Sequence, residues 1–359
     1  MRRRAGRAAV ALVAAGALLA GCGGDAGAPR WVGAPATSAA VPASPSPAGS
    51  APVPEITLAF AGDVHFTGRT LRLLDEPETA FGAIAGTLGD ADLTVLNLET
   101  AVTDRGTPQP KRFHFRAPKQ AYAALRAAGV DAVSIANNHT LDYGQVGLLD
   151  TLDSAAAAGY PVFGAGRDVD EAYAPWVTEV KAVRIAVLGM SQVGELASQW
   201  KPTATRPGIA MAFDAERASR AVAEARARAD LVIVFMHWGV EGSSCPSAQM
   251  TSFARRMARD GADIVLGTHA HTLLTDGWIG DTYVHYGLGN FLWYGNSHST
   301  DSGVLKLTVR DRAVVRNQFL PATVSGTGQP VLVSGAARKR IEDKLRRARS
   351  CAGLASGPA

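Results

Sequence analysis

One stretch of the sequence indicates the fold most clearly: Ser134-Ile135-Ala136-Asn137-Asn138-His139-Thr140-Leu141-Asp142-Tyr143-Gly144. Its first residues are small and apolar, as in a buried strand, and two amides, an imidazole and a carboxylate follow directly. A helix is expected from near Gly144. Polar groups at the carboxyl end of a buried strand lie where open α/β sheets bind their ligands. For this stretch alone an alternative stays open, in which the Asn and Asp residues only cap a strand-to-helix turn.

Apolar runs elsewhere alternate with helical patterns, which is typical of a domain rich in βαβ units. Strands are expected over 56–61, 93–96, 113–115, 132–136, 160–163, 184–188, 231–236, 264–266, 282–286, 303–309 and 314–320. Helices are expected over 79–88, 120–128, 146–158, 215–229 and 247–259. The sequence therefore predicts an α/β fold class.

Five of the expected strands end in residues that can bind a metal. The chain has eight histidines, and five of them follow these strand ends together with two carboxylates and an amide. Carboxylate, imidazole and amide oxygen together suit divalent ions such as Mn, Fe or Zn. Seven candidate ligands are too many for one tetrahedral ion and suit a pair of ions. The candidate metal ligands are Asp63, His65, Glu99, Asn138, His237, His269 and His271.

The same motifs, in this order, resemble the CapA family of poly-gamma-glutamate capsule biosynthesis proteins. The resemblance spans about residues 55–320 and rests on Gly62-Asp63, Asn97-Leu98-Glu99, Ala136 to Gly144, His237-Trp238-Gly239, Gly267 to His271 and Tyr286 to Phe291. That family is in turn similar to the calcineurin-like metallophosphoesterases. The resemblance implies a four-layer α/β/β/α sandwich of the metallophosphoesterase type.

The resemblance also implies a role for each motif residue. His139 would face the substrate as a general acid or transition-state stabiliser, with Asp142 orienting its ring. Substrate contacts are expected from Asn137, Tyr143, Trp238 and Asn290. One metal would be held by Asp63, His65 and His271, and the other by Asn138, His237 and His269, with Glu99 between them.

Two departures from the phosphoesterase pattern stand out. Those enzymes carry an Asp in a Gly-Asp motif where this chain has Glu99, so that the spacing or occupancy of the metals is in doubt. They also carry an acid directly after the catalytic histidine, whereas here the acid follows three residues later, at Asp142.

The first residues read as a targeting signal. Three arginines precede an Ala-rich apolar run, as in a secretory signal peptide. The ending Leu19-Ala20-Gly21-Cys22 resembles the lipobox of bacterial lipoproteins, which would make Cys22 the lipidated first residue of the mature protein. The expected organisation is a signal peptide over 1–21, a Pro/Ala/Ser/Gly-rich disordered tether over 22–54, a CapA-like domain over 55–325, and a basic C-terminal helix and tail over 326–359.

The charge and the cysteines of the chain give further information about its partners and its location. Without the four arginines of residues 1–21, the chain has 32 basic and 32 acidic residues, so that its net charge gives no case for nucleic acid as a partner. Seven basic residues lie between Arg338 and Arg349; a solvated helix is favoured, and contact with anionic lipid or polymer is the alternative. Cys245 and Cys351 can pair in an exported protein, and whether they do is left open.

The hypothesis from the sequence is a lipid-anchored protein on the extracytoplasmic face of the cell membrane. It would be a hydrolase or transferase with two divalent metal ions that acts on poly-gamma-glutamate or a related anionic polymer of the envelope. Capsule synthesis or export proteins are expected partners. Two alternatives remain: a non-catalytic polymer-binding accessory component, and a generic extracytoplasmic phosphodiesterase.

Overall fold

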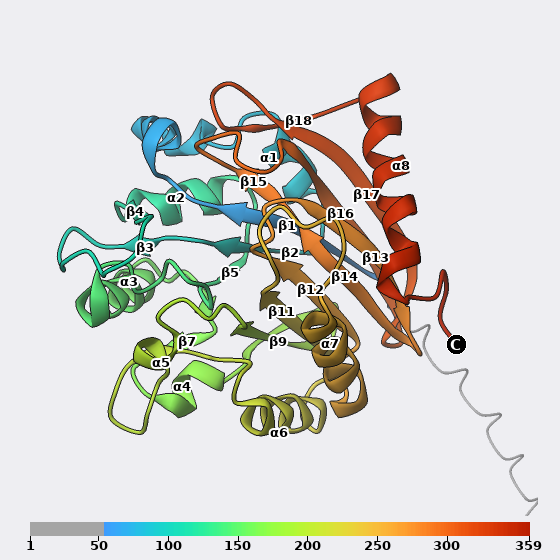
Figure 1. The fold of residues 1–359 in the computed structure, drawn as a ribbon, viewed down its shortest axis with the longest axis horizontal. Helices are drawn as coiled ribbons and strands as arrows, with labels where there is room; N and C mark the ends of the chain where they lie inside the picture. The colour runs from blue at the N-terminus through green and yellow to red at the C-terminus, as the bar shows by residue number, and fades with distance from the viewer. Residues whose placement is uncertain (1–53) are drawn as a thin grey trace, which may run out of the picture. The chain divides into compact units, whose positions relative to one another are not determined.

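The computed structural model describes residues 54–359 (Figure 1). The expected signal peptide, the lipidated Cys22 and almost all of the expected tether lie outside the described residues. Within residues 54–359, no helix is both long enough and apolar enough to cross a membrane.

Two large sheets form the centre of the domain. The first has eight strands in the order β18-β17-β16-β1-β2-β5-β6, with β15 paired to β1 beside this path. The strands of this sheet are β1 (Ile56–Val64), β2 (Leu93–Leu98), β5 (Ala132–Ser134), β6 (Val162–Phe163), β15 (Asn290–Leu292), β16 (Asp301–Arg310), β17 (Ala313–Val324) and β18 (Pro330–Leu332).

The second sheet has six strands in the order β13-β14-β12-β11-β9-β8. They are β8 (Trp176–Val180), β9 (Val183–Ser191), β11 (Leu231–His237), β12 (Ile264–Thr268), β13 (Leu273–Ile279) and β14 (Thr282–Leu288). Two short pairs complete the strands: β3 (Ala101–Val102) with β4 (Arg116–Ala117), and β7 (Ala165–Gly166) with β10 (Gly208–Ile209).

The helices cover the outer faces of the two sheets (Figure 1). They are α1 (Ile84–Gly89), α2 (Gln120–Ala127), α3 (Gly144–Ala157), α4 (Val169–Tyr173), α5 (Ala197–Trp200), α6 (Ala215–Arg226), α7 (Ala248–Asp260) and α8 (Gly335–Ala352), with the 3-10 helices η1 (Gly68–Asp75) and η2 (Pro77–Thr79).

Alternation of side chains along the strands divides the core into three layers of apolar contacts. In β1, Leu58 and Phe60 point toward the second sheet, while Ala59 and Ala61 pack under α1, α2 and α3. In the second sheet, Val187 faces the first sheet, and its neighbours on β9 pack under α6 and α7. The layers therefore run helix, sheet, sheet, helix, which confirms the predicted α/β/β/α class.

The parallel strands bring their carboxyl ends to one edge of each sheet. β1, β2 and β5 run parallel to one another, and so do β9, β11 and β12. A hydrogen bond of 2.8 Å joins Nε2 of His237, at the end of β11, to Oδ1 of Asn138, after β5. The edges at which the parallel strands of the two sheets end thus meet.

Two local expectations are wrong. Residues 113–115 are not a strand; the strand pairing begins one residue later, at β4, and the amide of Phe115 donates to the carboxylate of Asp142 rather than to a strand. The helix expected over 79–88 shrinks to α1, and residues 77–79 form a 3-10 turn that begins with Pro77. Pro fits such a first turn because it lacks an amide hydrogen.

The C-terminal helix α8 packs on β13 through Ile341 and Leu345, which contact Leu273. Six of its seven basic residues between 338 and 349 pair with carboxylates, and Arg340 and Lys344 both reach Asp301. Most of this positive charge is therefore neutralised within the domain, which favours the structural interpretation of the helix over a lipid-binding one.

A disulfide joins Cys351 at the end of α8 to Cys245, in the loop after β11, across a sequence separation of 106 residues. The pairing left open by the sequence is thus formed. Closing so long a loop removes much of the entropy of the unfolded chain.

Replacing both cysteines, Cys245→Ser with Cys351→Ser, is expected to lower the free energy of unfolding by about 4 kcal/mol because the unfolded chain regains that entropy. Urea unfolding of wild type and variant measures the difference. A reducing agent should destabilise the wild type to the same degree and leave the variant unchanged; equal stability of the two proteins in oxidising buffer would contradict the prediction.

Candidate metal centre and active site

Acidic and imidazole side chains from both sheets converge at the meeting edges. Potential ligand atoms lie within 4.8 Å of one another in three overlapping groups. The groups are Glu99 with His237 and His269, Asp63 with Glu99 and His271, and Glu241 with His269 and His271. Five of the seven predicted ligands are therefore brought together.

Asp63 is the penultimate residue of β1 and is completely buried. Its Oδ1 accepts a hydrogen bond of 2.7 Å from Asn97, and its Oδ2 accepts one of 3.1 Å from the backbone amide of His269. Its position depends on Gly62, where a Cβ atom would lie 1.8 Å from the carbonyl oxygen of Gly289. Only glycine allows this approach, which explains the Gly-Asp pair.

Glu99 lies between the groups and is the least satisfied side chain of the centre. It is fully buried, and neither carboxylate oxygen has a hydrogen-bond partner. Burial first, and then the charge of Asp63, raise its pKa well above the ordinary value. An unpartnered buried carboxylate is costly, and a bound cation would relieve that cost.

His269 and His271 occupy an unusual backbone conformation. Their φ angles are 82° and 52°, in the left-handed region that residues other than glycine rarely adopt. Such strain persists where the surrounding structure imposes it, and it concentrates at functional sites. Here it directs both rings of a His-x-His pair toward the carboxylates, with ring centroids 5.8 Å apart.

The protonation states of the imidazoles fit a metal. Burial lowers the pKa of His237 to about 3 and that of His269 well below the ordinary value, so that both rings are neutral and keep a free lone pair. Nδ1 of His269 is buried without a partner. Burial also disfavours the charged form of His271, but Glu99 and Asp63 outweigh it and raise its pKa to about 9. The carboxylates of Glu99 and Asp63 thus favour a positive charge at the position of His271.

Asn138 and His237 form the side of the centre nearer to the opening stretch. Besides its contact with Asn138, His237 places Nδ1 at 3.0 Å from Oγ1 of Thr268. Its Nε2 lies 3.3 Å from Oε1 of Glu99. The amide oxygen, the imidazole and the carboxylate are therefore close enough to share one ion, and the donor set as a whole fits a divalent metal.

His139 stands beside this group and is oriented by Asp142. Nδ1 of His139 lies 2.6 Å from Oδ2 of Asp142, which also accepts a hydrogen bond of 2.6 Å from the amide of Phe115. The Phe115 ring stacks on the imidazole at 3.8 Å between centroids. The free Nε2 of His139 points at the metal group, 3.8 Å from Oε1 of Glu99.

Lys111 is a site residue that the sequence analysis missed. Its side chain is only 1% exposed, and Nζ contacts Asp142 at 2.8 Å and Glu195 at 2.9 Å. Nζ also donates to the backbone carbonyl of Asn138 and lies 5.1 Å from the ring centroid of Trp200. This buried cation ties the loop after β3 to the His139 segment. Lys111 lies in an irregular loop without hydrophobic periodicity, so that the sequence pattern did not indicate its role.

Lys111→Met is expected to lower the free energy of unfolding by about 3–5 kcal/mol at about pH 8, because the buried Asp142 carboxylate loses its cation. Urea unfolding measures the loss. The control is Lys339→Met, which removes an exposed partner of Asp343 and should change stability by about 0.5 kcal/mol or less. Equal effects of the two substitutions would contradict the buried role.

Comparison with known proteins identifies a family whose model covers this part of the chain. The model of the family described as bacterial capsule synthesis protein PGA_cap matches residues 57–294, which include every residue of the centre. The chain belongs to this family.

Two curated relatives of this capsule synthesis family are similar along most of their length. The capsule biosynthesis protein CapA of Bacillus anthracis is 27% identical over 77% of this chain and 70% of its own length. The PGA biosynthesis protein CapA of Bacillus subtilis is 28% identical over 81% of this chain and 77% of its own length.

Among solved structures, the chain is similar to a phosphatase of Mycoplasma pneumoniae at 15% identity, with a TM-score of 0.48 over 82% of this chain and 99% of that chain. It is also similar to the NAD nucleotidase of Haemophilus influenzae at 13% identity, with a TM-score of 0.43 over 86% of this chain and 65% of that chain.

In this member of the capsule synthesis family, His65 stays outside the ligand group. Both of its ring nitrogens face backbone amides, at 3.1 Å from Thr67 and 3.4 Å from Tyr294. The ring is packed among Phe115, Trp293 and Tyr294. The alternation that was expected to align it with Asp63 ends at Val64, where the pairing of β1 with β15 shifts register.

Three predicted substrate-binding residues serve the structure instead. Asn137 is fully buried, and it donates to Asn97 and to the carbonyl of Leu98 while accepting from the amide of His139. It holds the turn that carries Asn138 and His139. Trp238 is fully buried in the core under α7 and donates to the carbonyl of Tyr286. These two assignments are corrected because neither side chain reaches a surface that substrate can touch.

Asn290 is the third correction. It is fully buried, and its Oδ1 accepts from Nδ1 of His271 at 2.9 Å, so that it orients a ligand rather than the substrate. Tyr143 is half-buried, and its ring carries the guanidinium of Arg116 at 3.5 Å. The contact between Tyr143 and substrate therefore stays a prediction.

Glu241 is a second residue that the sequence analysis missed. It is exposed, yet its carboxylate belongs to a group with His269 and His271 and pairs with His298 at 3.0 Å. It lies in the loop between β11 and α7, four residues before Cys245. The motif His237-Trp238-Gly239 just before it was the only available signal.

Proposed function

We propose that this chain is a metal-dependent hydrolase or transferase that acts on poly-gamma-glutamate or a related anionic polymer during capsule synthesis or processing. The observation that carries the proposal is the buried group of carboxylates and neutral imidazoles with the His139–Asp142 pair aimed at it. The capsule-related names of the two Bacillus relatives support the choice of polymer.

The residues that would hold metal are Asp63, Glu99, Asn138, His237, His269 and His271, with Glu241 at the outer side. When bound, divalent ions lower the pKa of a water molecule and polarise the oxygen of the target bond. Glu99 belongs to two of the three ligand groups, so that it would serve both ions. Asn97 fixes the carboxylate of Asp63, and Asn290 fixes the imidazole of His271.

His139 moves the proton. Burial first, and then the charge of Lys111, lower its pKa well below the ordinary value, so that Nε2 is a free acceptor in the resting protein. It is thus equipped to take a proton from the attacking water or hydroxyl and then to deliver it to the leaving group. Asp142 holds the ring in the tautomer with hydrogen on Nδ1, as in other carboxylate–imidazole pairs.

We further propose that the domain is anchored by lipid at Cys22 on the extracytoplasmic face of the membrane. The support is the signal-like beginning of the sequence and the Cys245–Cys351 disulfide, since disulfides persist in oxidising compartments. Labelling of cells with a radioactive fatty acid, in wild type and in Cys22→Ser, tests the anchor; label retained by the variant would contradict it.

The catalytic proposal is tested by incubating the manganese-loaded protein with poly-gamma-glutamate and, separately, with a chromogenic phosphodiester. Shortening of the polymer that is lost on chelation supports the proposal. Turnover of the phosphodiester alone would favour the generic phosphodiesterase. Metal binding without turnover of either compound would favour the non-catalytic accessory component.

A further inference from the structure

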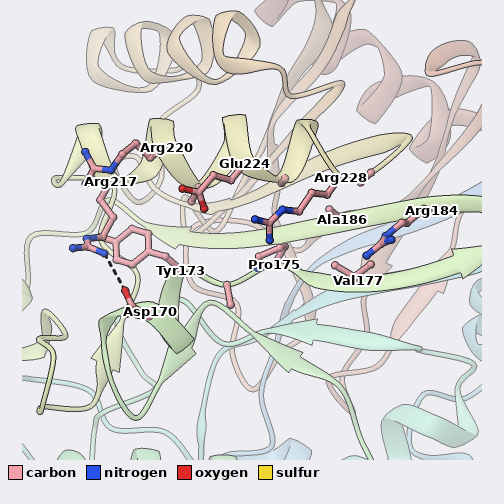
Figure 2. Close-up of a pocket in the computed structure, with 14 residues that line it drawn as sticks. Asp170, Tyr173, Pro175, Val177, Arg184, Ala186, Arg217, Arg220, Glu224 and Arg228 are labelled. Carbon is pink, nitrogen blue, oxygen red and sulfur yellow. Dashed lines mark hydrogen bonds and ion pairs between the residues drawn. The ribbon is translucent and has the colours of Figure 1, made fainter. Parts of the chain in front are cut away.

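A second concave surface lies between α6 and β8, on the outer side of the second sheet. It encloses about 420 Å³. One wall is a single face of α6 and the turn after it, with Arg217, Arg220, Glu224 and Arg228 at intervals of three or four residues. Figure 2 shows Glu224 projecting from α6 into the groove, and Arg228, in the turn after α6, projecting toward Pro175. We call this surface the arginine groove.

Positive charge dominates the arginine groove. It is lined by four arginines and two acids, whereas the chain beyond residue 21 is formally neutral. Among these arginines only Arg217 pairs with carboxylates, with Asp170 at 3.4 Å (Figure 2) and with Asp214 at 4.0 Å. Arg184, Arg220 and Arg228 are exposed, and within residues 54–359 their guanidinium groups have no ion-pair partner. They contrast with the basic residues of α8, most of which are neutralised.

The arginines are spread along the groove rather than gathered at one point. From Arg217 to Arg228 the helix face rises by about 16 Å, and Glu224 separates the last arginine from the others. A single phosphate or sulfate is too small to contact all of these guanidinium groups at once. A chain with carboxylates at intervals would meet several, each through a paired hydrogen bond of the Arg–carboxylate type.

The floor of the groove suits the rest of such a chain. Tyr173, Pro175, Val177 and alanines line it, and the side chain of Val177 is 43% exposed. Apolar surface of this kind packs against methylene groups. β8 is the edge strand of its sheet, which leaves one side of its backbone free to hydrogen-bond with amides.

The groove is separate from the metal centre. Arg184 is at the beginning of β9, whereas Ser191 at its end pairs with His237 of the centre. Seven residues of strand span about 23 Å, so that a ligand that reaches from Arg184 to the centre must be extended. None of the residues that line the groove belongs to a ligand group. The groove is therefore not part of the site described above.

We propose that the arginine groove is a second binding site for a carboxylate-bearing polymer, which it holds while another part of the same chain reaches the metal centre. The choice of a glutamate polymer as occupant rests on the proposed function, whereas the preference for an extended polyanion rests on the arginines. The site would increase the effective concentration of polymer at the centre.

The test is binding of fluorescently labelled poly-gamma-glutamate to the full-length protein in detergent at about 0.05 M salt, followed by fluorescence anisotropy. Arg220→Glu with Arg228→Glu is expected to weaken binding on the order of tenfold, which corresponds to about 1.4 kcal/mol. The matched control is Arg72→Glu with Arg347→Glu, two exposed arginines elsewhere, which should bind as the wild type does.

Unchanged binding in the groove variant, or an equal loss in the control, overturns the proposal. Tighter binding of polyphosphate than of poly-gamma-glutamate overturns the carboxylate assignment. The groove variant should keep its metal content and its turnover of a small chromogenic phosphodiester, which separates a groove effect from damage to the centre. Groove-dependent binding by a protein that hydrolyses nothing would support the groove and contradict the catalytic proposal.

Discussion

Alanine at both His269 and His271 is expected to remove the metal from the protein. The wild type, purified without chelator, should carry about two equivalents of a transition metal, since the donors suffice for two ions. The double variant loses one neutral imidazole and one that the carboxylates hold, and these two rings participate in all three ligand groups. Elemental analysis of both proteins measures the change.

The control for this experiment is His114→Ala. His114 is half-buried and contacts the carbonyl of Gln109 rather than the ligand group, so that the metal content should stay at the wild-type value. A wild-type protein that binds no Mn, Fe or Zn even after reconstitution would overturn the hydrolase proposal. Metal retained by the double variant would place the ions elsewhere.

Removal of the His139 imidazole is expected to have the second largest effect. His139→Gln should lower kcat by about 10²–10⁴-fold, because a proton-transferring group contributes that much to a rate. KM and metal content should change little, since His139 belongs to none of the ligand groups. Steady-state kinetics on whichever compound the wild type turns over, polymer or phosphodiester, measure both constants.

Asp142→Asn provides the comparison for His139. The amide keeps the size of the side chain but no longer favours hydrogen on Nδ1 of His139, so that kcat should fall by a smaller factor than in His139→Gln. A rise in KM with a fall in kcat and loss of metal, in either variant, would show that the pair supports the ligands rather than the chemistry.

The rule that ligands gather at strand ends predicted much of the centre. It located five ligands because each lies at or within a few residues of the end of a buried apolar run: Asp63, Glu99, His237, His269 and His271. The parallel direction of those strands then brings the ends to one edge, which a pattern of residues can indicate without coordinates. The layered fold followed from the same alternation.

Side-chain direction was not predictable in the same way. Trp238 and Asn137 each adjoin a residue of the centre in the sequence. Neighbouring residues point to opposite sides, however, and both of these side chains are fully buried. His65 follows the register shift after Asp63, which no alternation reveals. Lys111 and Glu241 come from irregular loops, where only the folded chain determines which groups meet.

The disulfide has a consequence for the order in which the protein is assembled. Cys351 lies near the end of α8, and its partner Cys245 lies four residues after Glu241. β1, which positions Asp63, also pairs with β16, about 250 residues later. The strand that carries Asp63 is therefore fully paired only when the chain as far as β16 is available. The disulfide in addition needs the end of α8, and contacts so distant in sequence form slowly.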